Sequence, residues 1–334
     1  MPKAAKRKPK EKPVGAWSAT TIALIVLWIL STVGVAIAYL TRPPAAIKLT
    51  LVASNVAFDV AQGASQLLLS DADLDSFTVS GFDVLQPDTG GTGRGSIRAA
   101  GAAVPSLTVR PARLETVTVP AGTHVVVNWS ADEPDAVRLT ASRQPAHGSL
   151  RAVDGTVVSC HGCNPETPDP GIADIAWVGR ATGGGTTILL RRQLQNPLRI
   201  SQDDVAVDGA LDTSDLAGSE RVSTIKDGEI TYLGVNRTEK LGVAARLVLD
   251  EIAPGTGRLK DLSVTKDGVR VTFEARVGKL GVMEAGQLTN KLPSWLELGF
   301  RNQTWLLLTQ GVLLAGGTAT KLFSFWRQRR GGDR

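Results

Sequence analysis

Residues 263–275 read SVTKDGVRVTFEA, and this stretch carries the pattern that decides the fold class. From Val269 to Glu274, three apolar residues alternate with three polar ones. Such alternation predicts a β-strand with one buried and one exposed face. The dipeptide Asp267-Gly268 favours a tight turn before that strand, because its backbone suits the twist of antiparallel strands. The stretch therefore predicts an antiparallel hairpin.

The same preference for apolar and β-branched residues recurs in IKLTLV (47–52), SLTVR (106–110), LETVTV (114–119), HVVVNW (124–129), TTILLR (186–191) and EITYLGV (229–235). Asp-Gly turns are also predicted at 154–155, 208–209 and 227–228. Strands do not alternate with long helical patterns, which argues against a parallel α/β sheet. The expected fold is mostly β: an antiparallel β-sandwich-like exported region flanked by two transmembrane α-helices.

The β region has a candidate boundary at residues 159–185, which contain CHGCNPETPDPG and ATGGG. Pro and Gly clusters of this kind are typical of loops. The division predicts one β-domain at 45–158 and a second at 186–285. A single large sandwich is the alternative.

An uncharged run of 28 residues extends from Val14 to Thr41. About 20 apolar residues suffice to cross the hydrocarbon core, so residues 17–40 are predicted to form a transmembrane helix. Trp17 and Tyr39 lie near its two ends, as membrane-interface anchors do. A cleaved signal peptide is the alternative, because Ala36-Ile37-Ala38 has the form of a cleavage site. The length of the run favours an uncleaved signal anchor.

A second apolar run, residues 304–326, is predicted to be the second transmembrane helix, with Trp305 and Trp326 as interface anchors. Its apolar residues surround the whole helix, which favours a span over an amphipathic surface helix. The preceding LPSWLELGF has helical spacing of its apolar residues after a proline suited to a first turn. Residues 291–301 are therefore expected to form an interfacial helix, with Trp295 as a further anchor.

The net charge of +5 is concentrated in the two tails. Residues 1–16 hold six cations and one anion, and residues 321–334 hold five cations and one anion. The rest holds 26 cations against 30 anions, so no broad cationic surface for nucleic acid is expected. The positive-inside bias predicts that both tails, 1–16 and 327–334, are cytoplasmic. Residues 42–301 would then be periplasmic in a two-pass inner-membrane protein.

Small residues recur at four-residue spacing in both predicted spans, at Gly34, Ala38, Gly311, Ala315 and Ala319. This spacing lets transmembrane helices approach closely. The predicted packing is between the two spans or with a partner. The alternative is the ordinary abundance of small residues in membrane helices.

Cys160 and Cys163 are the only cysteines, and His161 lies between them. A local disulfide is the expected state in an oxidising periplasm. A redox pair is disfavoured because the prolines that follow forbid the helix that would activate the first thiol. A metal site stays an alternative, although it would need ligands from elsewhere in the chain.

Acidic residues form two groups that do not complete a metal motif. The sequence DADLDS (71–76) lacks the Gly and Glu that an EF-hand requires, so a solvated turn is expected. A second group is expected to be a polar loop, with calcium binding as the alternative; its members are Asp203, Asp204, Asp208, Asp212 and Asp215.

No catalytic residue and no cofactor are predicted. His124 lies in a strand pattern and is expected to be a packing or edge residue. A Ser-His-Asp triad around His147 stays open, because triads are recognised by geometry. The chain has no G-x-S-x-G nucleophile elbow, and we therefore expect no enzyme.

The predicted function is a two-span membrane protein whose large periplasmic β-domain acts as a binding, scaffolding or complex-assembly module. Its expected partners are the lipid bilayer and membrane or periplasmic proteins, with no nucleic acid. One alternative is a membrane-anchored periplasmic redox or metal protein, or an enzyme, that uses Cys160, His161 and Cys163. Another is a ligand-sensing subunit that signals through a partner.

Overall fold

The computed structural model describes residues 19–63, 66–87, 97–99, 104–164, 174–180, 185–192, 197–201, 204–217, 220–235, 237–284, 286–295 and 297–298. Contacts group the chain into two compact units, Met1–Pro43 with Pro293–Arg334, and Pro44–Leu292. Several predictions fall on residues outside the described ranges: 1–16, Trp17, the span 304–326 with Trp305, Gly311, Ala315, Ala319 and Trp326, and the tail 327–334.

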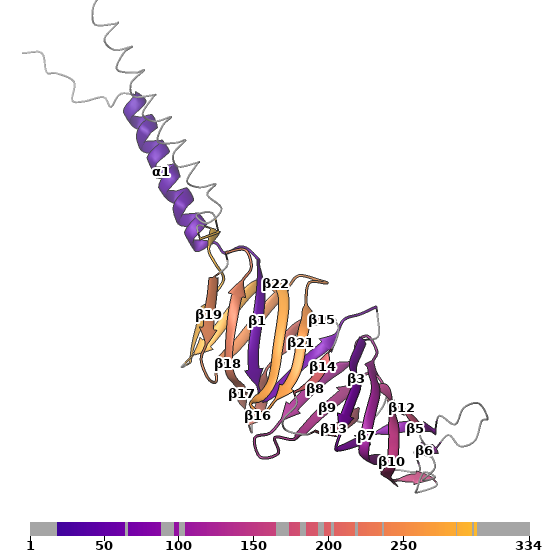
Figure 1. Ribbon diagram of the computed structural model, residues 1–334. Helices are drawn as coiled ribbons and strands as arrows, with labels where there is room; N and C mark the ends of the chain where they lie inside the picture. Colours follow the sequence, from indigo (N-terminus) through magenta and orange to yellow (C-terminus); the bar gives the residue numbers. More distant parts are fainter. Residues whose placement is uncertain are drawn as a thin grey trace, which may run out of the picture. The chain divides into compact units, whose positions relative to one another are not determined.

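The first unit contains the helix α1 (Ala19–Leu40), whose 22 residues include no charged side chain (Figure 1). After it, the Thr41 amide donates to the Ile37 carbonyl at 2.8 Å. The side chains are described from Val26 onward, and the large apolar ones are exposed: Val26, Leu27, Trp28, Ile29, Leu30, Val33, Val35, Ile37, Tyr39 and Leu40. Judged on the described residues, no helix combines the length and the hydropathy expected of a membrane span.

The second unit consists of β-strands, and the expectation of a mostly antiparallel β fold is confirmed. Every pairing among the described strands is antiparallel. Twenty-one strands join into one extended sheet, and two more form a separate hairpin, β16 (Ser214–Ala217) with β17 (Glu220–Ser223).

One group of strands surrounds the long strand β7 (Ser106–Val119), which pairs with β10 on one side and with β3 and β4 on the other (Figure 1). The group also holds β2 (Asn55–Val60), β3 (Gln66–Leu74), β4 (Ser76–Ser80), β5 (Phe82–Pro87), β6 (Ile97–Ala99), β8 (His124–Trp129), β9 (Ala136–Ser142), β10 (His147–His161), β11 (Cys163–Asn164), β12 (Asp174–Gly179) and β13 (Thr186–Arg191).

A second group surrounds the longest strand, β22 (Gly268–Glu284), which pairs with β1, β20, β21 and β23. The group holds β1 (Ala45–Ala53), β14 (Leu198–Ser201), β18 (Ile225–Tyr232), β19 (Arg237–Leu241), β20 (Arg246–Ile252), β21 (Arg258–Thr265) and β23 (Gln287–Asn290). The strand β15 (Val205–Asp212) joins the two groups, because it pairs with both β21 and β2.

Strands that are far apart in the chain pair with each other in the extended sheet. β1, from the first predicted β-domain, pairs with β18 and β22 from the second. β1 has a strict alternation of buried residues with partly or fully exposed ones, which is the pattern of a strand with one face on the core. Its buried members Ile47, Leu49 and Leu51 are at most 1% exposed. Core packing therefore draws the first strand to the last ones.

The predicted Asp-Gly turns have different outcomes. The hairpin predicted at Asp267-Gly268 does form between β21 and β22, with Lys266 and Asp267 in the turn and Gly268 as the first residue of β22. The turns predicted at 154–155, 208–209 and 227–228 are wrong, because these residues lie inside β10, β15 and β18. Gly209 still has a left-handed φ of 78°, but it serves a β-bulge rather than a hairpin. Neighbouring strands thus override the local turn preference.

Candidate functional site

A row of four polar residues crosses the β sheet where its two strand groups meet. Asp208 of β15 is the direct partner of Asp59 of β2, which is the partner of His124 of β8. His124 is in turn the partner of Ser142 of β9. Direct cross-strand partners lie on the same face of a sheet, so the four side chains share one face. We refer to these four residues as the polar row.

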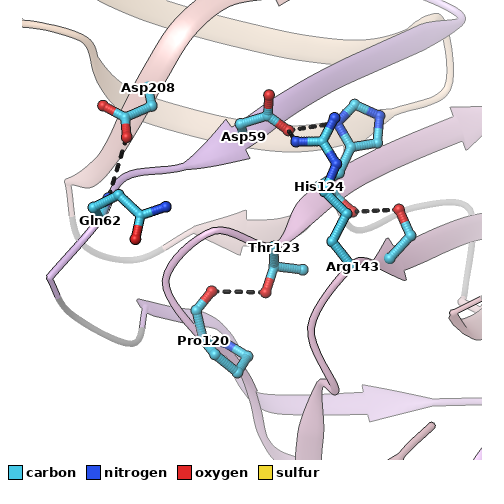
Figure 2. Close-up of polar contacts among 8 residues, drawn as sticks. Asp59, Gln62, Pro120, Thr123, His124, Arg143 and Asp208 are labelled. Carbon is cyan, nitrogen blue, oxygen red and sulfur yellow. Dashed lines mark hydrogen bonds and ion pairs between the residues drawn. The ribbon is translucent and has the colours of Figure 1, made fainter. Parts of the chain in front are cut away.

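Two side chains, His124 and Arg143, converge on Asp59 (Figure 2). His124 Nδ1 lies 2.7 Å from Asp59 Oδ1, and an Arg143 guanidinium nitrogen donates to the same oxygen at 3.1 Å. Arg143 follows β9 in a left-handed conformation with φ 74°, just past the last strand residue. The side chains of His124 and Asp59 are 32% and 37% exposed. Water therefore screens the interactions of Asp59, and such partly exposed pairs contribute little to stability.

The polar row does not contain a Ser-His-Asp triad. The Ser142 hydroxyl donates to the His124 backbone carbonyl at 3.4 Å, so it does not face the imidazole as a nucleophile must. Asp208 accepts a hydrogen bond from the Gln62 backbone amide at 3.2 Å, and His124 bonds to Asp59 instead (Figure 2). Around His147, no hydrogen bond joins its side chain to a Ser or an Asp among the described residues. The arrangement orients a histidine but supplies no nucleophile.

Sequence reasoning missed the polar row. Its members are distant in sequence, and only the register of four strands brings them together. The sequence predicts that His124 is a packing or edge residue. It does not lie at an edge, because β8 pairs with both β2 and β9, and its side chain contacts Asp59. The alternation of HVVVNW does place His124 on the less buried face of its strand, and this was the one available signal.

The structure also contains a hollow of about 230 Å³ in the second unit. It is lined by Ala210, Leu211, Asp212, Thr213, Ser214, Arg221, Ser223, Arg246, Leu247, Val248 and Leu249. Asp212 accepts the Ser214 hydroxyl at 2.6 Å and pairs with Arg221 at 3.3 Å. Arg246 has no ion pair within the described part of the chain. The hollow therefore carries one more cation than anions.

The cysteine loop lies where β10 passes into β11. Cys160 is buried, does not titrate and is disulfide-bonded, and there is no free cysteine among the described residues. His161 is exposed, and Gly162 has a left-handed φ of 69° at the turn. The side chain of Cys163 lies outside the described residues, so its pairing with Cys160 stays a prediction.

Most members of the two acidic groups lie in strands rather than in loops. Asp71 and Asp73 lie in β3 and are exposed, and Asp75 follows that strand. Asp204 pairs with Lys260, and Asp208 and Asp212 have the partners given above; Asp203 lies outside the described residues. No cluster of three possible metal ligands occurs in the part of the chain that the structure describes.

The predicted membrane-facing residues of α1 and the chain after β23 are exposed. Tyr39 is 63% and Trp295 52% exposed, and a Cβ placed on Gly34 would have nothing within 4 Å. Trp295 begins a helical turn, in which the Leu298 amide donates to the Ser294 carbonyl at 3.1 Å. A buried residue that the sequence did not single out is Arg192 after β13, where burial lowers the pKa of the guanidinium.

Comparisons with known proteins do not identify a family. No family model and no curated protein matches the chain. Two solved structures have weak likenesses, at 10% identity and a TM-score of 0.08 each. One is Scytalido-glutamic peptidase with a peptide-based transition state analog, covering 70% of this chain and 98% of that chain. The other is SCP-B of the Eqolisin family with the tripeptide Ala-Ile-His, covering 71% and 100%. Likenesses this weak carry no argument about the fold or the function.

Proposed function

We propose that this protein is anchored in a membrane by two helices and presents its β unit as a binding or complex-assembly module. The observation that carries the proposal is the exposure of α1. Its large apolar side chains from Val26 to Leu40 are solvent-exposed. A helix in water needs a polar face, whereas a helix that is apolar all round needs an apolar surrounding. The apolar run of the sequence that contains α1, residues 17–40, has the length that the hydrocarbon core of a bilayer requires.

The return of the chain near the end of α1 supports a second span. Ser294 and Glu297 form a reciprocal capping box, in which each backbone amide donates to the other's side chain, at 2.7 Å and 3.2 Å. The Trp295 amide donates to the Thr41 carbonyl at 3.4 Å. A helix that starts here starts beside the last residues of α1. Residues 304–326, the second apolar run, follow in the chain.

The basic tails support the orientation, with both ends on the cytoplasmic side and residues 42–301 across the membrane. A binding role is favoured over catalysis because the polar row presents a histidine and carboxylates without a nucleophile in reach. In bacteria the compartment is the periplasm, which also agrees with a local disulfide between Cys160 and Cys163.

Anchoring is tested by extracting membranes with alkaline carbonate after expression of the full chain. The protein should stay in the membrane fraction. Leu30→Asp, near the middle of α1, should release a large part of it, because an acidic residue at a helix centre opposes insertion by about 3 kcal/mol. The matched control is Leu288→Asp, since Leu288 is similarly exposed but lies on β23. Equal release of both variants would contradict the anchor.

Topology is tested with a reporter that is active only in the cytoplasm and one that is active only outside it. Each is fused to either terminus or inserted at the exposed turn of Gly255, where a Cβ would meet nothing within 4 Å. The termini should report the cytoplasm and Gly255 the other side. Opposite signals from the two termini would overturn the two-span proposal.

A further inference from the structure

The strand β15 changes its surroundings halfway along its length. Near its start it lies between two strands, because the Val207 amide donates to Gly257 on the β21 side while the Ala206 carbonyl accepts from Ala61 on the β2 side. Beyond Asp208 it bulges, and three residues of β15 stand opposite a single residue of β2. This second half lies near β20, yet no strand pairing joins the two among the described residues.

The hollow of about 230 Å³ lies along the edge of β20. Its lining includes Arg246, Leu247, Val248 and Leu249, which are four consecutive residues of this strand. Successive side chains point to opposite faces of a sheet, so four in a row can line one hollow only along an edge. The other edge of β20 is paired with β22, which contributes nothing to the lining. Within the described part of the chain no strand pairs with the edge of β20 that faces the hollow, so its backbone groups are available for pairing.

The hollow has the features of a site for an added strand. An exposed edge offers main-chain donors and acceptors in a row, and a peptide can extend the sheet there. Val248, which lines the hollow at this edge, is 36% exposed. Arg246 lies at the start of the strand, while Asp212 already neutralises Arg221. The uncompensated charge is positive and favours a carboxylate on the ligand.

We propose that the unpaired edge of β20 binds an extended polypeptide segment of a partner protein as an additional strand, with Arg246 opposite a carboxylate of that segment. This inference rests on the proposed binding function and gives that function its contact surface. Because main-chain hydrogen bonds supply most of such an interaction, recognition tolerates many sequences that favour β structure. The carboxylate fixes the register of the segment along β20.

The test uses the full chain in detergent and the blocked heptapeptide Thr-Val-Thr-Val-Glu-Val-Thr with a fluorophore. Anisotropy should show binding, and hydrogen exchange of the β20 amides should slow when the peptide is present. Two further peptides carry N-methyl groups on alternate residues, one on the odd and one on the even positions. An added strand uses one edge of the peptide, so one of these should bind and the other should not. Binding of both, or no binding of the parent peptide, overturns the proposal.

The charge is tested by replacing Glu with Gln in the peptide, which should weaken binding about fivefold, as for one partly exposed ion pair. Arg246→Gln should abolish this difference between the two peptides. Arg270→Gln is the matched control, since Arg270 is exposed on β22 and does not line the hollow. A preference for Glu that survives Arg246→Gln would overturn the role of Arg246. A chain that is dimeric through β20 before peptide is added would assign the edge to a second copy instead.

A photo-crosslinking amino acid at Val248 or at Leu288 of β23, in native membranes, separates this inference from the broader proposal. Adducts at Val248 that disappear with Arg246→Glu support a strand partner at β20. Adducts at Leu288 alone preserve a binding module and overturn the β20 site. No adduct at either position overturns both.

Discussion

Gly148 allows close packing in the β7 group, and replacing it should show how that group is stabilised. It lies in β10 between two strands, opposite Val117 of β7 and Trp177 of β12. A Cβ on Gly148 would lie 2.4 Å from the Thr116 carbonyl oxygen and 2.7 Å from Cζ2 of Trp177. Ordinary contacts begin near 3.4 Å, so Gly148→Ala requires a displacement of about 1 Å in a close-packed interior.

Neither obstructing group can move easily. The Thr116 carbonyl is part of the backbone of the paired strand β7. Trp177 is 1% exposed, and its ring centroid lies 6.4 Å from that of Phe77. Overpacking of this kind costs about 1–3 kcal/mol, and the entropic advantage of Ala over Gly recovers less than about 1 kcal/mol. The expected net loss is about 2 kcal/mol, or a fall in Tm of about 4–8 °C for a unit of this size.

The loss is measured by thermal and urea unfolding of the full chain in detergent, followed by tryptophan fluorescence. Gly242→Ala is the matched control, because its Cβ would meet only a Glu284 oxygen at 3.8 Å, and its Tm should stay within about 2 °C. In a Trp177→Leu background, Gly148→Ala should cost about 1 kcal/mol less, since the indole contacts are gone. An unchanged Tm for Gly148→Ala would refute the close approach of β7, β10 and β12.

Three further outcomes are expected. Asp59→Asn should lower stability by less than about 1 kcal/mol at low salt and by almost nothing at 1 M salt, because its partners are partly exposed; Tm at the two salt concentrations measures this. Ser294→Ala should cost about 1 kcal/mol through loss of the cap, measured by faster proteolysis near Trp295, whereas Ser294→Asp should retain the cap. Reduction of Cys160, if it is bonded within its four-residue loop, should cost about 2 kcal/mol in urea unfolding, and no effect of reductant would contradict that pairing.

The sequence predicted the strands well because each carries its own pattern. HVVVNW and TTILLR coincide with β8 and β13, residue for residue. SLTVR and LETVTV were predicted as separate runs, and they lie in the single strand β7. The hairpin at Asp267-Gly268 was also predictable, because the turn and both flanking strands are contiguous in the chain. The local sequence pattern was therefore sufficient to predict individual strands and the hairpin whose parts are contiguous in the chain.

The pairing of distant strands could not be predicted in this way. Asp227-Gly228 has the same local signature as Asp267-Gly268, yet it lies inside β18, where Gly228 is opposite Leu51 of β1. A Cβ on Gly228 would lie 3.1 Å from the Leu51 side chain, so this glycine serves close packing rather than a turn. The same dipeptide thus has a different role because its neighbour, β1, lies more than 170 positions away in the chain. A single sequence contains no signal that identifies such a distant partner strand.

The strand β15 contributes residues to both candidate sites, the polar row and the hollow. Both sites depend on how this strand pairs with distant ones, so neither could be recognised in the sequence. The position of Asp208 in β15 places it opposite Asp59 and so completes the polar row. The bulge that follows, at Gly209 with its left-handed φ, ends the regular pairing and leaves the second half of β15 beside β20 without a ladder. A shorter or regular β15 would pair with β20 and close the hollow.

Because a bulge is a local and inexpensive change in a strand, deleting Gly209 should shift the register of residues 210–212 and alter the β20 site before it unfolds the sheet. Slower hydrogen exchange of the β20 amides in that deletion variant is the expected sign, and unchanged exchange would separate the hollow from the bulge.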